Sequence, residues 1–437
     1  MKRYLVALLL LAACTSPLDQ VDIPLSEIEQ QPFVATLENG LTVTVREMHS
    51  LPLVSIQFWV HVGSRNEPEN KKGIAHVFEH MWFKGTDTQE VGSFHKRVEK
   101  LGGELNAMTS HDWTSYFVTV PSDKFDDIFP YMVDLLRNPL FDEVELKKEL
   151  EVVVEEQRMS FNTPERSLDD LFGLSLIDKH PYRHPIIGYK ETILSIERDE
   201  VIDFYNTWYV PNNMNIVVAG DVSSLEIVDK INTAFTDFKP RELPELILPE
   251  ELPITTPRYN STSRDIGFNY LAIGFVGPPS GHPDYYPMRV FNMIFAESES
   301  SRLQEIVKKQ KNLIVRGLSV FVGLNDMGVF EMITVVDPEK RNDATAELLV
   351  QLNRFKFEPV TDEELARAKR LIRAQHVKNQ EEVFDVGHSI GQAWVDGTLD
   401  EYAEYLDKID AVTKEDIQDV LNKYFTSYTI AELKPKL

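Results

Sequence analysis

The sequence predicts an α+β protein of two homologous halves, each mixing helices and strands, joined by a proline-rich linker. Strand-like and helix-like patterns alternate along most of the 437 residues. Five prolines fall in the segment 239–262, which therefore suits neither a regular helix nor an interior strand. The flanking segments, 31–238 and 263–437, are similar in length and repeat the order of a strand, a polar loop and an apolar helix.

The first half opens with a β-hairpin signal, an Asn-Gly pair between the alternating apolar runs of the segment 35–45. A strand is expected at 53–62, followed by a loop rich in Gly, Asn, Glu and Pro and then by a helical pattern at 73–84. Strands and helices alternate from there to the apolar run at 215–220. This half therefore mixes both types of element.

The second half repeats this order as far as a helix at 286–295. When that helix is aligned with the helix of the first half, Arg289 and Met293 stand opposite His76 and His80. The second copy therefore lacks the two histidines that give the first copy its metal-binding character.

The composition excludes several classes of function. The formal net charge of −25 and the absence of a local Lys/Arg cluster leave no surface suited to phosphate backbones, so we expect no nucleic-acid partner. The only cysteine, Cys14, rules out an internal disulfide and zinc sites built from several thiolates. Any metal ion must therefore bind to histidines and carboxylates.

The N-terminus resembles a secretory signal. Lys2-Arg3 precedes an apolar run at 4–13 that is too short to span a bilayer. The tetrapeptide Leu11-Ala12-Ala13-Cys14 resembles the bacterial lipobox, in which cleavage before the cysteine leaves it lipidated. On this interpretation, residues 1–13 are a lipoprotein signal peptide and residues 14–30 a tether. The alternative is a plain signal peptide with a spectator cysteine.

This N-terminus predicts a protein of the bacterial periplasm that touches a membrane only through a lipid anchor on Cys14. Thr15 and Ser16, which follow the cysteine, resemble outer-membrane sorting rather than inner-membrane retention. The expected location is therefore the outer membrane, facing the periplasm.

The motif His76-Val77-Phe78-Glu79-His80 is the strongest chemical signal. Positions i and i+4 of a helix share a face, so both imidazoles can bind one ion, and Glu79 points the same way. Val77 and Phe78 face the other side and can anchor the helix in the core. The segment 180–185 has the same histidine spacing, but its two prolines prevent a helix and predict a loop.

A catalytic zinc site also needs a third ligand and an open position for water. In the segment 141–160, Glu149 and Glu156 lie on or beside an apolar stripe, where an unpaired carboxylate would be costly. Coordination to zinc and a hydrogen bond from a zinc-bound histidine would satisfy such carboxylates. The alternative is a solvated helix with Lys147 and Lys148 as ion-pair partners.

The inverted motif His-x-x-Glu-His, followed 76 positions after its second histidine by a glutamate in a Glu-x6-Glu segment, resembles the insulinase/pitrilysin family of zinc peptidases, the inverzincins. That family includes mitochondrial processing peptidase and short bacterial members. The resemblance also covers the segments 37–41, 63–67, 76–85, 102–107 and 180–182. It implies two metallohydrolase-type repeats that enclose a chamber, the first bearing zinc and the second lacking the zinc motif.

The resemblance implies a zinc endopeptidase that acts on peptides or unfolded segments. It makes His76, His80 and Glu156 the ligands of one zinc ion per chain, Glu79 the general base and Glu149 an outer-shell partner. This assignment agrees with the chemistry, because zinc lowers the pKa of its water to about 7 and polarises the scissile carbonyl, while Glu79 can take and return the proton.

The resemblance also implies a substrate-binding strand. Asn106 and Ala107 match the edge strand on which the family lays an extended peptide, binding its main chain by β-augmentation. We therefore expect both residues to contact substrate. The alternative for Asn106 is a turn residue after Gly102-Gly103.

One departure from the family pattern concerns partners. Members that act alone or as homodimers carry an Arg and, seven residues later, a Tyr in the second half, which help to hold the substrate. Lys308 and Val315 occupy these positions here. Either the pair is dispensable and the enzyme is a monomer or homodimer, or a homologous chain supplies the Arg/Tyr pair in a heterodimer.

Two other functions compete with this interpretation. The chain could be a non-catalytic or processing-type subunit of a larger assembly, although the intact set of ligands and base argues against an idle subunit. A carboxylate-bridged di-iron site would need Glu-x-x-His pairs on two helices, and no glutamate stands three residues before any histidine.

Overall fold

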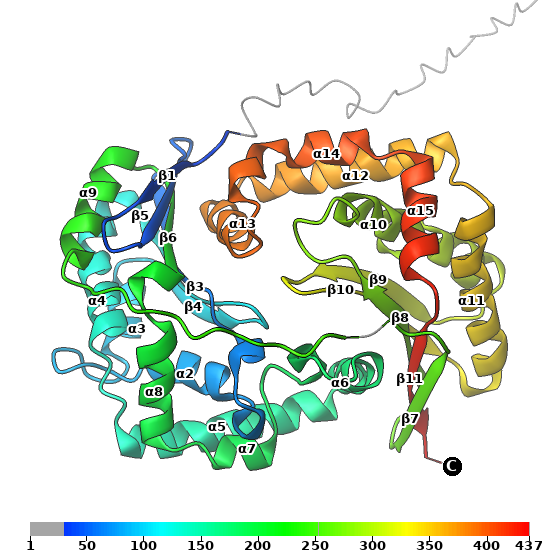
Figure 1. Ribbon diagram of the computed structural model, residues 1–437, viewed down its shortest axis with the longest axis horizontal. Coiled ribbons are helices and arrows are strands. Elements are labelled where there is room, and N and C mark those ends of the chain that lie inside the picture. The colour runs from blue at the N-terminus through cyan, green and yellow to red at the C-terminus, as the bar shows by residue number, and fades with distance from the viewer. Residues whose placement is uncertain (1–29, 252, 437) are drawn as a thin grey trace, which may run out of the picture.

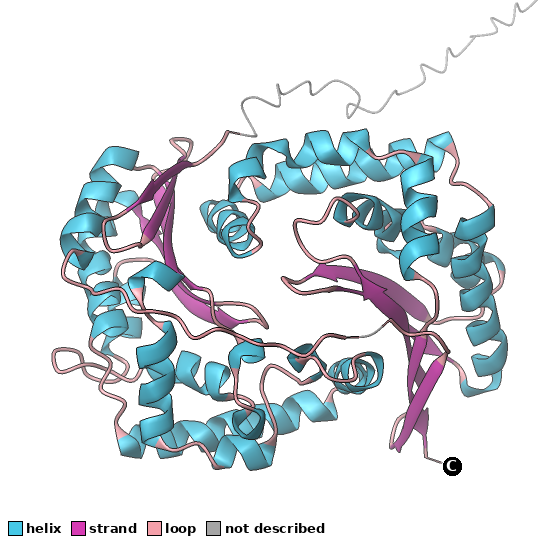
Figure 2. Cartoon of the chain, in the orientation of Figure 1, coloured by secondary structure: helices cyan, strands magenta, loops and turns pink. Residues whose placement is uncertain are grey.

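The computed structural model describes residues 30–251 and 253–436 and consists of two α/β halves, each built on one mixed sheet (Figure 1). The first sheet has six strands in the order β1-β2-β6-β3-β5-β4, and the second has five in the order β7-β11-β8-β10-β9. Figure 2 shows helices along the outer side of each sheet. The predicted α+β class is confirmed; the predicted signal peptide, Cys14 and most of the tether lie outside the described residues.

The elements of the first half, apart from short 3₁₀ turns, are β1 (Phe33–Thr36), β2 (Thr42–Glu47), β3 (Leu53–Val60), α2 (Ile74–Trp82), α3 (Ser93–Lys100), β4 (Glu104–Thr109), β5 (Thr114–Pro121), α4 (Phe125–Arg137), α5 (Glu143–Asn162), α6 (Pro164–Leu176), α7 (Lys190–Leu194), α8 (Arg198–Trp208), β6 (Met214–Gly220) and α9 (Ser224–Phe235).

Those of the second half are β7 (Arg258–Arg264), β8 (Asn269–Gly277), α10 (Tyr285–Asn292), the π-helices η7 (Met293–Glu297) and η8 (Leu303–Gln310), β9 (Arg316–Gly323), β10 (Gly328–Val336), α11 (Arg341–Phe357), α12 (Asp362–Asn379), α13 (Val383–Val395), α14 (Tyr405–Ala411), α15 (Lys414–Tyr424) and β11 (Thr429–Pro435).

The central strands of the first sheet are buried on both faces. Every residue of β6 and all but the first of β3 are buried, which explains their nearly continuous apolar sequences. On one face, apolar side chains of the sheet pack against α2, α4, α5, α8 and α9. The other face is covered by a helix from the second half.

The two halves exchange one helix each. Helix α13 of the second half packs on β3 and β6, where Val386 and Ile390 join Trp59 in a buried cluster. Helix α6 of the first half packs in turn on β8 and β11, where Phe172 and Leu176 join Leu433. Figure 1 shows both helices beside the sheet of the other half. The apolar faces of the two sheets are therefore closed only when the halves are together.

Glycine permits the close approach of α13 to the first sheet. A Cβ atom at Gly391 would lie 2.0 Å from Cε2 of Trp59, and one at Gly387 would lie 2.5 Å from Nε2 of Gln57. Real Cβ atoms do not come so close to another heavy atom, so any larger residue would push the helix away.

Several element boundaries differ from the sequence prediction. Strand β3 ends at Val60 rather than at residue 62. The helix expected at 286–295 is split into α10 and the π-helix η7, and buried Asn292 at the junction hydrogen-bonds to Glu297 and Ser319. Strand β7 starts at Arg258 inside the predicted linker, because backbone donors are available after Pro257 and pair with β11.

Within residues 30–251 and 253–436, no helix combines the length and the apolar character needed to cross a bilayer.

Candidate metal centre

Helix α2 is fixed by its apolar face. Val77, Phe78, Met81 and Trp82 are buried, whereas His76, Glu79 and His80 on the other side are half-buried. The ring of Phe78 lies 4.2 Å from that of Tyr209, centroid to centroid. Because the core fixes the direction of the helix, it also fixes the direction in which the three polar side chains point.

The start of α2 is held by a buried glutamate that the sequence reasoning did not single out. The carboxylate of Glu67 accepts hydrogen bonds from the backbone N–H groups of Gly73, at 3.0 Å, and Ala75, at 2.9 Å. Burial raises the pKa of Glu67 to about 8, while these two bonds oppose the rise. Acceptors for unpaired helix N–H groups stabilise the first turn, so Glu67 anchors the segment that presents His76.

The predicted metal ligands converge. One donor atom each from His76, His80 and Glu156 lie within 4.8 Å of one another, the only such group of three among the described residues. Nε2 of His76 is 4.0 Å and Nε2 of His80 is 3.6 Å from Oε2 of Glu156. Tetrahedral zinc bonds of about 2 Å would set ligand atoms about 3.4 Å apart. Two imidazoles and a carboxylate on α2 and α5 therefore fit a zinc ion.

Glu149 lies behind the ligands. Its Oε2 accepts a hydrogen bond from Nδ1 of His80 at 3.2 Å, and its Oε1 is 2.6 Å from Nζ of Lys84. Burial opposes the charge of Glu149, but the bonds from His80 and Lys84 outweigh it and lower its pKa. With Nδ1 of His80 so engaged, Nε2 is left to face Glu156, which is the arrangement that histidine metal ligands usually have.

The alternative of a merely salt-bridged helix does not describe these glutamates. Lys147 pairs with Glu143 at 2.7 Å and Lys148 pairs with Glu145 at 2.6 Å, both on the exposed side of α5. Glu149 and Glu156 turn instead toward α2. The other His-x3-His segment also behaves as predicted, since Pro181–Arg183 forms only a 3₁₀ turn.

The two histidines carry different proton affinities before metal binds. Burial lowers the pKa of His76 to about 4, and the charge of His80 adds to this effect. Burial acts the same way on His80, but hydrogen bonds to Glu149 and Glu156 overcome it and raise its pKa to about 9. Since a metal binds neutral imidazole, loading the site at neutral pH must release the proton of His80.

Glu79, the predicted general base, is the third polar side chain on this face of α2. It projects from the same helix face as the two histidines but does not belong to the group of three converging ligands. Its Oε2 accepts a hydrogen bond from the hydroxyl of Thr109 at 2.5 Å. Burial raises the pKa of Glu79, and the bond from Thr109 partly offsets the rise.

The predicted substrate strand lies at an edge of the first sheet. Asn106 and Ala107 lie in β4, which pairs with β5 and with no other strand in the described part of the chain. Asn106 is therefore in a strand rather than in a turn. Its Oδ1 accepts a hydrogen bond from the backbone N–H of Ala107 at 2.9 Å. A peptide adding to this edge would have to compete with that contact.

The residues at the expected Arg/Tyr positions belong to the second half. Lys308 lies half-buried in η8, and Val315, which is exposed, precedes β9. Neither side chain can reproduce the hydrogen bonds of a tyrosine hydroxyl or a bidentate guanidinium.

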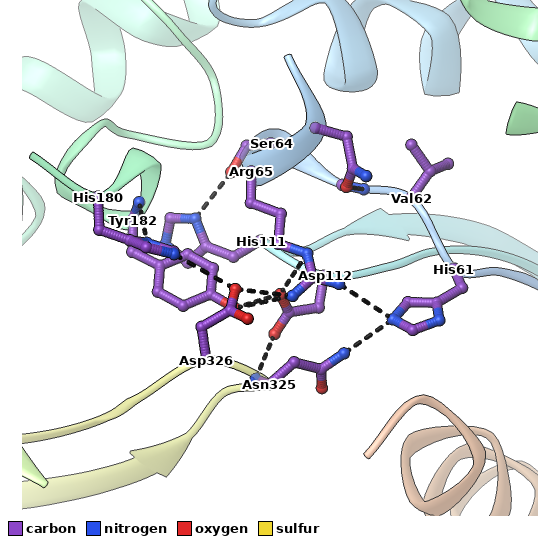
Figure 3. A network of polar contacts seen from close by, with 12 residues as sticks. His61, Val62, Ser64, Arg65, His111, Asp112, His180, Tyr182, Asn325 and Asp326 are labelled. Carbon is purple, nitrogen blue, oxygen red and sulfur yellow. Dashed lines mark hydrogen bonds and ion pairs between the residues drawn. The ribbon is translucent and has the colours of Figure 1, made fainter. Parts of the chain in front are cut away.

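A partly buried polar network joins the two halves beside α2 (Figure 3). Arg65, in the loop before α2, lies between Asp112 of the β4–β5 turn, with Nε to Oδ1 at 3.2 Å, and Asp326 of the β9–β10 turn, with Nη1 to Oδ2 at 2.8 Å. The hydroxyl of Tyr182 donates to Asp112. The backbone N–H of Asn325 also donates to Asp112, at 3.0 Å.

Histidines complete this network. Nε2 of His61 accepts from Nδ2 of Asn325 at 2.8 Å, and Nε2 of His180 is 3.3 Å from Oδ2 of Asp326. Burial, reinforced by the charge of Arg65, lowers the pKa of His61 to about 4, so it stays neutral and can accept. None of these contacts was predicted, because the partners are far apart in sequence. Arg65 and Asp326, for example, are 261 positions apart.

Comparisons with known proteins agree with this geometry. Residues 42–188 match the insulinase (peptidase family M16) domain and residues 195–372 the peptidase M16 inactive domain. An uncharacterized zinc protease of Rickettsia felis is 29% identical over 92% of this chain and 96% of its own. The zinc protease PqqE of Helicobacter pylori is 28% identical over 92% of both chains. A probable mitochondrial-processing peptidase subunit beta of Arabidopsis thaliana is 26% identical over 91% of this chain and 77% of its own.

Solved structures extend the similarity to the whole fold. A protease from Helicobacter pylori superimposes with a TM-score of 0.88 at 28% identity, covering 92% of this chain and 99% of that one. The periplasmic protease PqqL from Escherichia coli shares the fold, with a TM-score of 0.76 at 20% identity over 92% of this chain and 47% of that one. With both halves matched and the His-x-x-Glu-His helix in place, the chain belongs to the peptidase M16 (insulinase) family.

Proposed function

We propose that this chain is a zinc-dependent endopeptidase that hydrolyses peptides or unfolded segments. The convergence of His76, His80 and Glu156 from two helices is the observation that carries the proposal. Relatives that align over nearly the whole chain are named zinc proteases, which supports the same conclusion. The donor set of two imidazoles and one carboxylate leaves a fourth position for water, as catalytic zinc sites require.

Each residue of the proposed site has a separate role. His76, His80 and Glu156 would hold the zinc ion, which when bound supplies a water of lowered pKa and polarises the scissile carbonyl. Glu79 takes the proton from that water and returns it to the leaving amine. Glu149 orients His80 through Nδ1.

Binding of the substrate falls to the first sheet. Strand β4, with Asn106 and Ala107, would receive an extended peptide along its free edge. An extended peptide offers its backbone to this edge whatever its side chains, which suits peptides and unfolded segments better than folded proteins.

Metal analysis combined with peptide hydrolysis tests this function. The zinc-reconstituted chain should contain one zinc ion, and His76→Ala, His80→Ala and Glu156→Ala should each lose it. Glu79→Gln should keep zinc and lose most turnover, because it removes the base and no ligand. Glu155→Ala is the matched control, since Glu155 is exposed and, among the described residues, pairs with Arg158 alone, outside the group of converging ligands. A metal-free wild type, or a Glu79→Gln variant at the wild-type rate, would overturn the proposal.

The proposed location is the periplasmic side of the outer membrane, with lipid on Cys14. The lipobox-like Leu11-Ala12-Ala13-Cys14 supports this, and one structural relative, PqqL, is described as periplasmic. Cys14→Ser should release the protein from the membrane fraction or leave the precursor uncleaved. An unchanged membrane fraction, with mass spectrometry finding no acyl chain, would exclude the anchor.

The proposed partner is a homologous chain that carries the Arg/Tyr pair and lacks the zinc motif. Lys308 and Val315 support this, because the chain would activate water yet hold the peptide poorly, and positioning accounts for several kcal/mol of a barrier. The two chains would close around a chamber. Full kcat/KM for the purified chain alone, with no second family member copurifying, would favour a monomer or homodimer. Intact zinc binding without hydrolysis, alone or with that partner, would favour a non-catalytic subunit.

A further inference from the structure

Thr109, the last residue of β4, contacts the carboxylate that the proposed function uses for proton transfer. Its hydroxyl donates to Oε2 of Glu79 at 2.5 Å. A hydrogen bond to an ionised acceptor is shorter and about twice as strong as one between neutral groups. We propose that Thr109 is a positioning residue, whose hydroxyl fixes the orientation of the Glu79 carboxylate relative to the metal ligands. This inference rests on the proposed function.

The Glu79 carboxylate needs a hydrogen-bond donor of its own, because the neighbouring polar groups are already engaged with one another. His80 is held by Glu149 and faces Glu156, so its ring has little freedom to turn. Glu79, in contrast, carries its carboxylate on a side chain with three rotatable bonds. A proton acceptor must stay within hydrogen-bond reach of the water that it deprotonates, and preorganisation spares the reaction the cost of finding that geometry.

Thr109 is itself firmly placed. It pairs with Thr114 in the β4–β5 ladder, and the turn that follows is closed by the N–H of Ser110 donating to the carbonyl oxygen of Trp113 at 2.8 Å. Asp112 in the same turn is bound by Tyr182 and by Asn325 of the second half. The network of Figure 3 therefore fixes the end of the strand from which Thr109 projects.

One strand would then serve two purposes. The edge of β4 is proposed to receive the substrate backbone, and its last side chain holds the base. The distance between the scissile peptide and Glu79 would be set within a single element. Loss of the Thr109 hydroxyl should therefore reduce turnover while leaving substrate affinity and metal binding in place.

Two substitutions separate the hydroxyl from the shape of the side chain. Thr109→Val keeps the β-branched volume and removes the donor, whereas Thr109→Ser keeps the donor. Both would be assayed with an internally quenched peptide that the zinc-loaded wild-type chain cleaves, with zinc content and thermal unfolding measured in parallel. We expect Thr109→Val to lower kcat about tenfold or more with KM within about twofold, and Thr109→Ser to stay within about threefold of wild type.

A second background tests whether the effect passes through the base. In Glu79→Gln, where no carboxylate remains to be oriented, Thr109→Val should change the residual kcat little. Wild-type kcat in Thr109→Val would overturn the inference. So would an equal loss in Thr109→Ser, a loss of zinc or stability that accounts for the kcat change, or a full additional tenfold loss in the Glu79→Gln background. An inactive zinc-loaded wild type, or a fully active Glu79→Gln, would instead overturn the proposed function.

Discussion

Replacing Arg65 by methionine would leave Asp112 as an uncompensated charge between the two halves. The side chains of Arg65 and Asp112 are only 11% and 3% exposed. Removing one partner of a buried ion pair typically costs about 3–5 kcal/mol. Asp112 keeps two donors, the Tyr182 hydroxyl and the N–H of Asn325, so the lower end of that range applies. We therefore expect Arg65→Met to lower the free energy of unfolding by about 3 kcal/mol.

The second partner of Arg65 adds little to this figure. Asp326 is 35% exposed, and a pair open to water is worth less than about 1 kcal/mol. Proton uptake by Asp112 limits the loss of stability that Arg65→Met can cause. Burial already raises the pKa of Asp112, and a neutral Asp112 no longer needs a cation. The double variant Arg65→Met/Asp112→Asn should accordingly recover part of the loss.

Urea unfolding at pH 7, followed by tryptophan fluorescence, measures the change. Trp113 follows Asp112 directly and packs against Trp59 with the ring centroids 4.6 Å apart, so the signal reports on this contact. Arg158→Met is the matched control: Arg158 and Glu155 are 62% and 55% exposed, and the expected loss is below about 0.5 kcal/mol. If Arg65→Met lost no more stability than Arg158→Met, the conclusion that this network stabilises the contact between the two halves would be wrong.

Three other perturbations have definite expected outcomes. The pKa of His61 falls to about 4 on folding, so the unfolded chain binds more protons between pH 6.5 and 4 and stability is lost as pH falls; His61→Gln keeps an acceptor without titrating and should gain up to about 3 kcal/mol on wild type between pH 7 and 4 in urea titrations. A pH-independent difference would contradict this. Gly391→Ala should cost about 2 kcal/mol or more in unfolding assays because its methyl group meets Trp59, whereas Gly267→Ala, whose Cβ meets nothing within 4 Å, should be nearly neutral; equal effects would refute the packing argument. A chelator should abolish activity and lower the melting temperature of the zinc-loaded chain but leave that of Glu156→Ala unchanged, and a drop of equal size in Glu156→Ala would place the metal elsewhere.

Local patterns predicted the parts of the site that lie within one element. The spacing of His76 and His80 requires only a helix, and the apolar residues between them require only a core on the opposite side, so α2 and its polar face could be predicted from the sequence. The period of α5 likewise indicated that Glu149 and Glu156 turn inward. Their separate roles came from the family resemblance, and the hydrogen bond from His80 now distinguishes Glu149 geometrically.

Contacts between distant segments could not be predicted. The bond from Thr109 to Glu79 joins a strand end to a helix 30 positions earlier, and the network around Arg65 spans both halves. Neither set of contacts produces a periodic pattern in the sequence, because each depends on how the sheets are placed in space. The pairing of β7 with β11 was not predicted for the same reason. The two strands are parallel and 171 positions apart, so no short turn between them marks the pairing in the sequence.

The exchange of α6 and α13 also determines how late the protein can finish folding. The first sheet is complete in sequence at Gly220, yet the helix that covers its inner face begins only at Val383. Contacts of such long sequence separation form slowly, after the loop between them has been closed. During synthesis the apolar surface around Trp59 and Val217 therefore stays open to water and to chaperones until nearly nine-tenths of the chain has been made. A fragment that ended before α13 would retain every proposed zinc ligand and still be prone to aggregate.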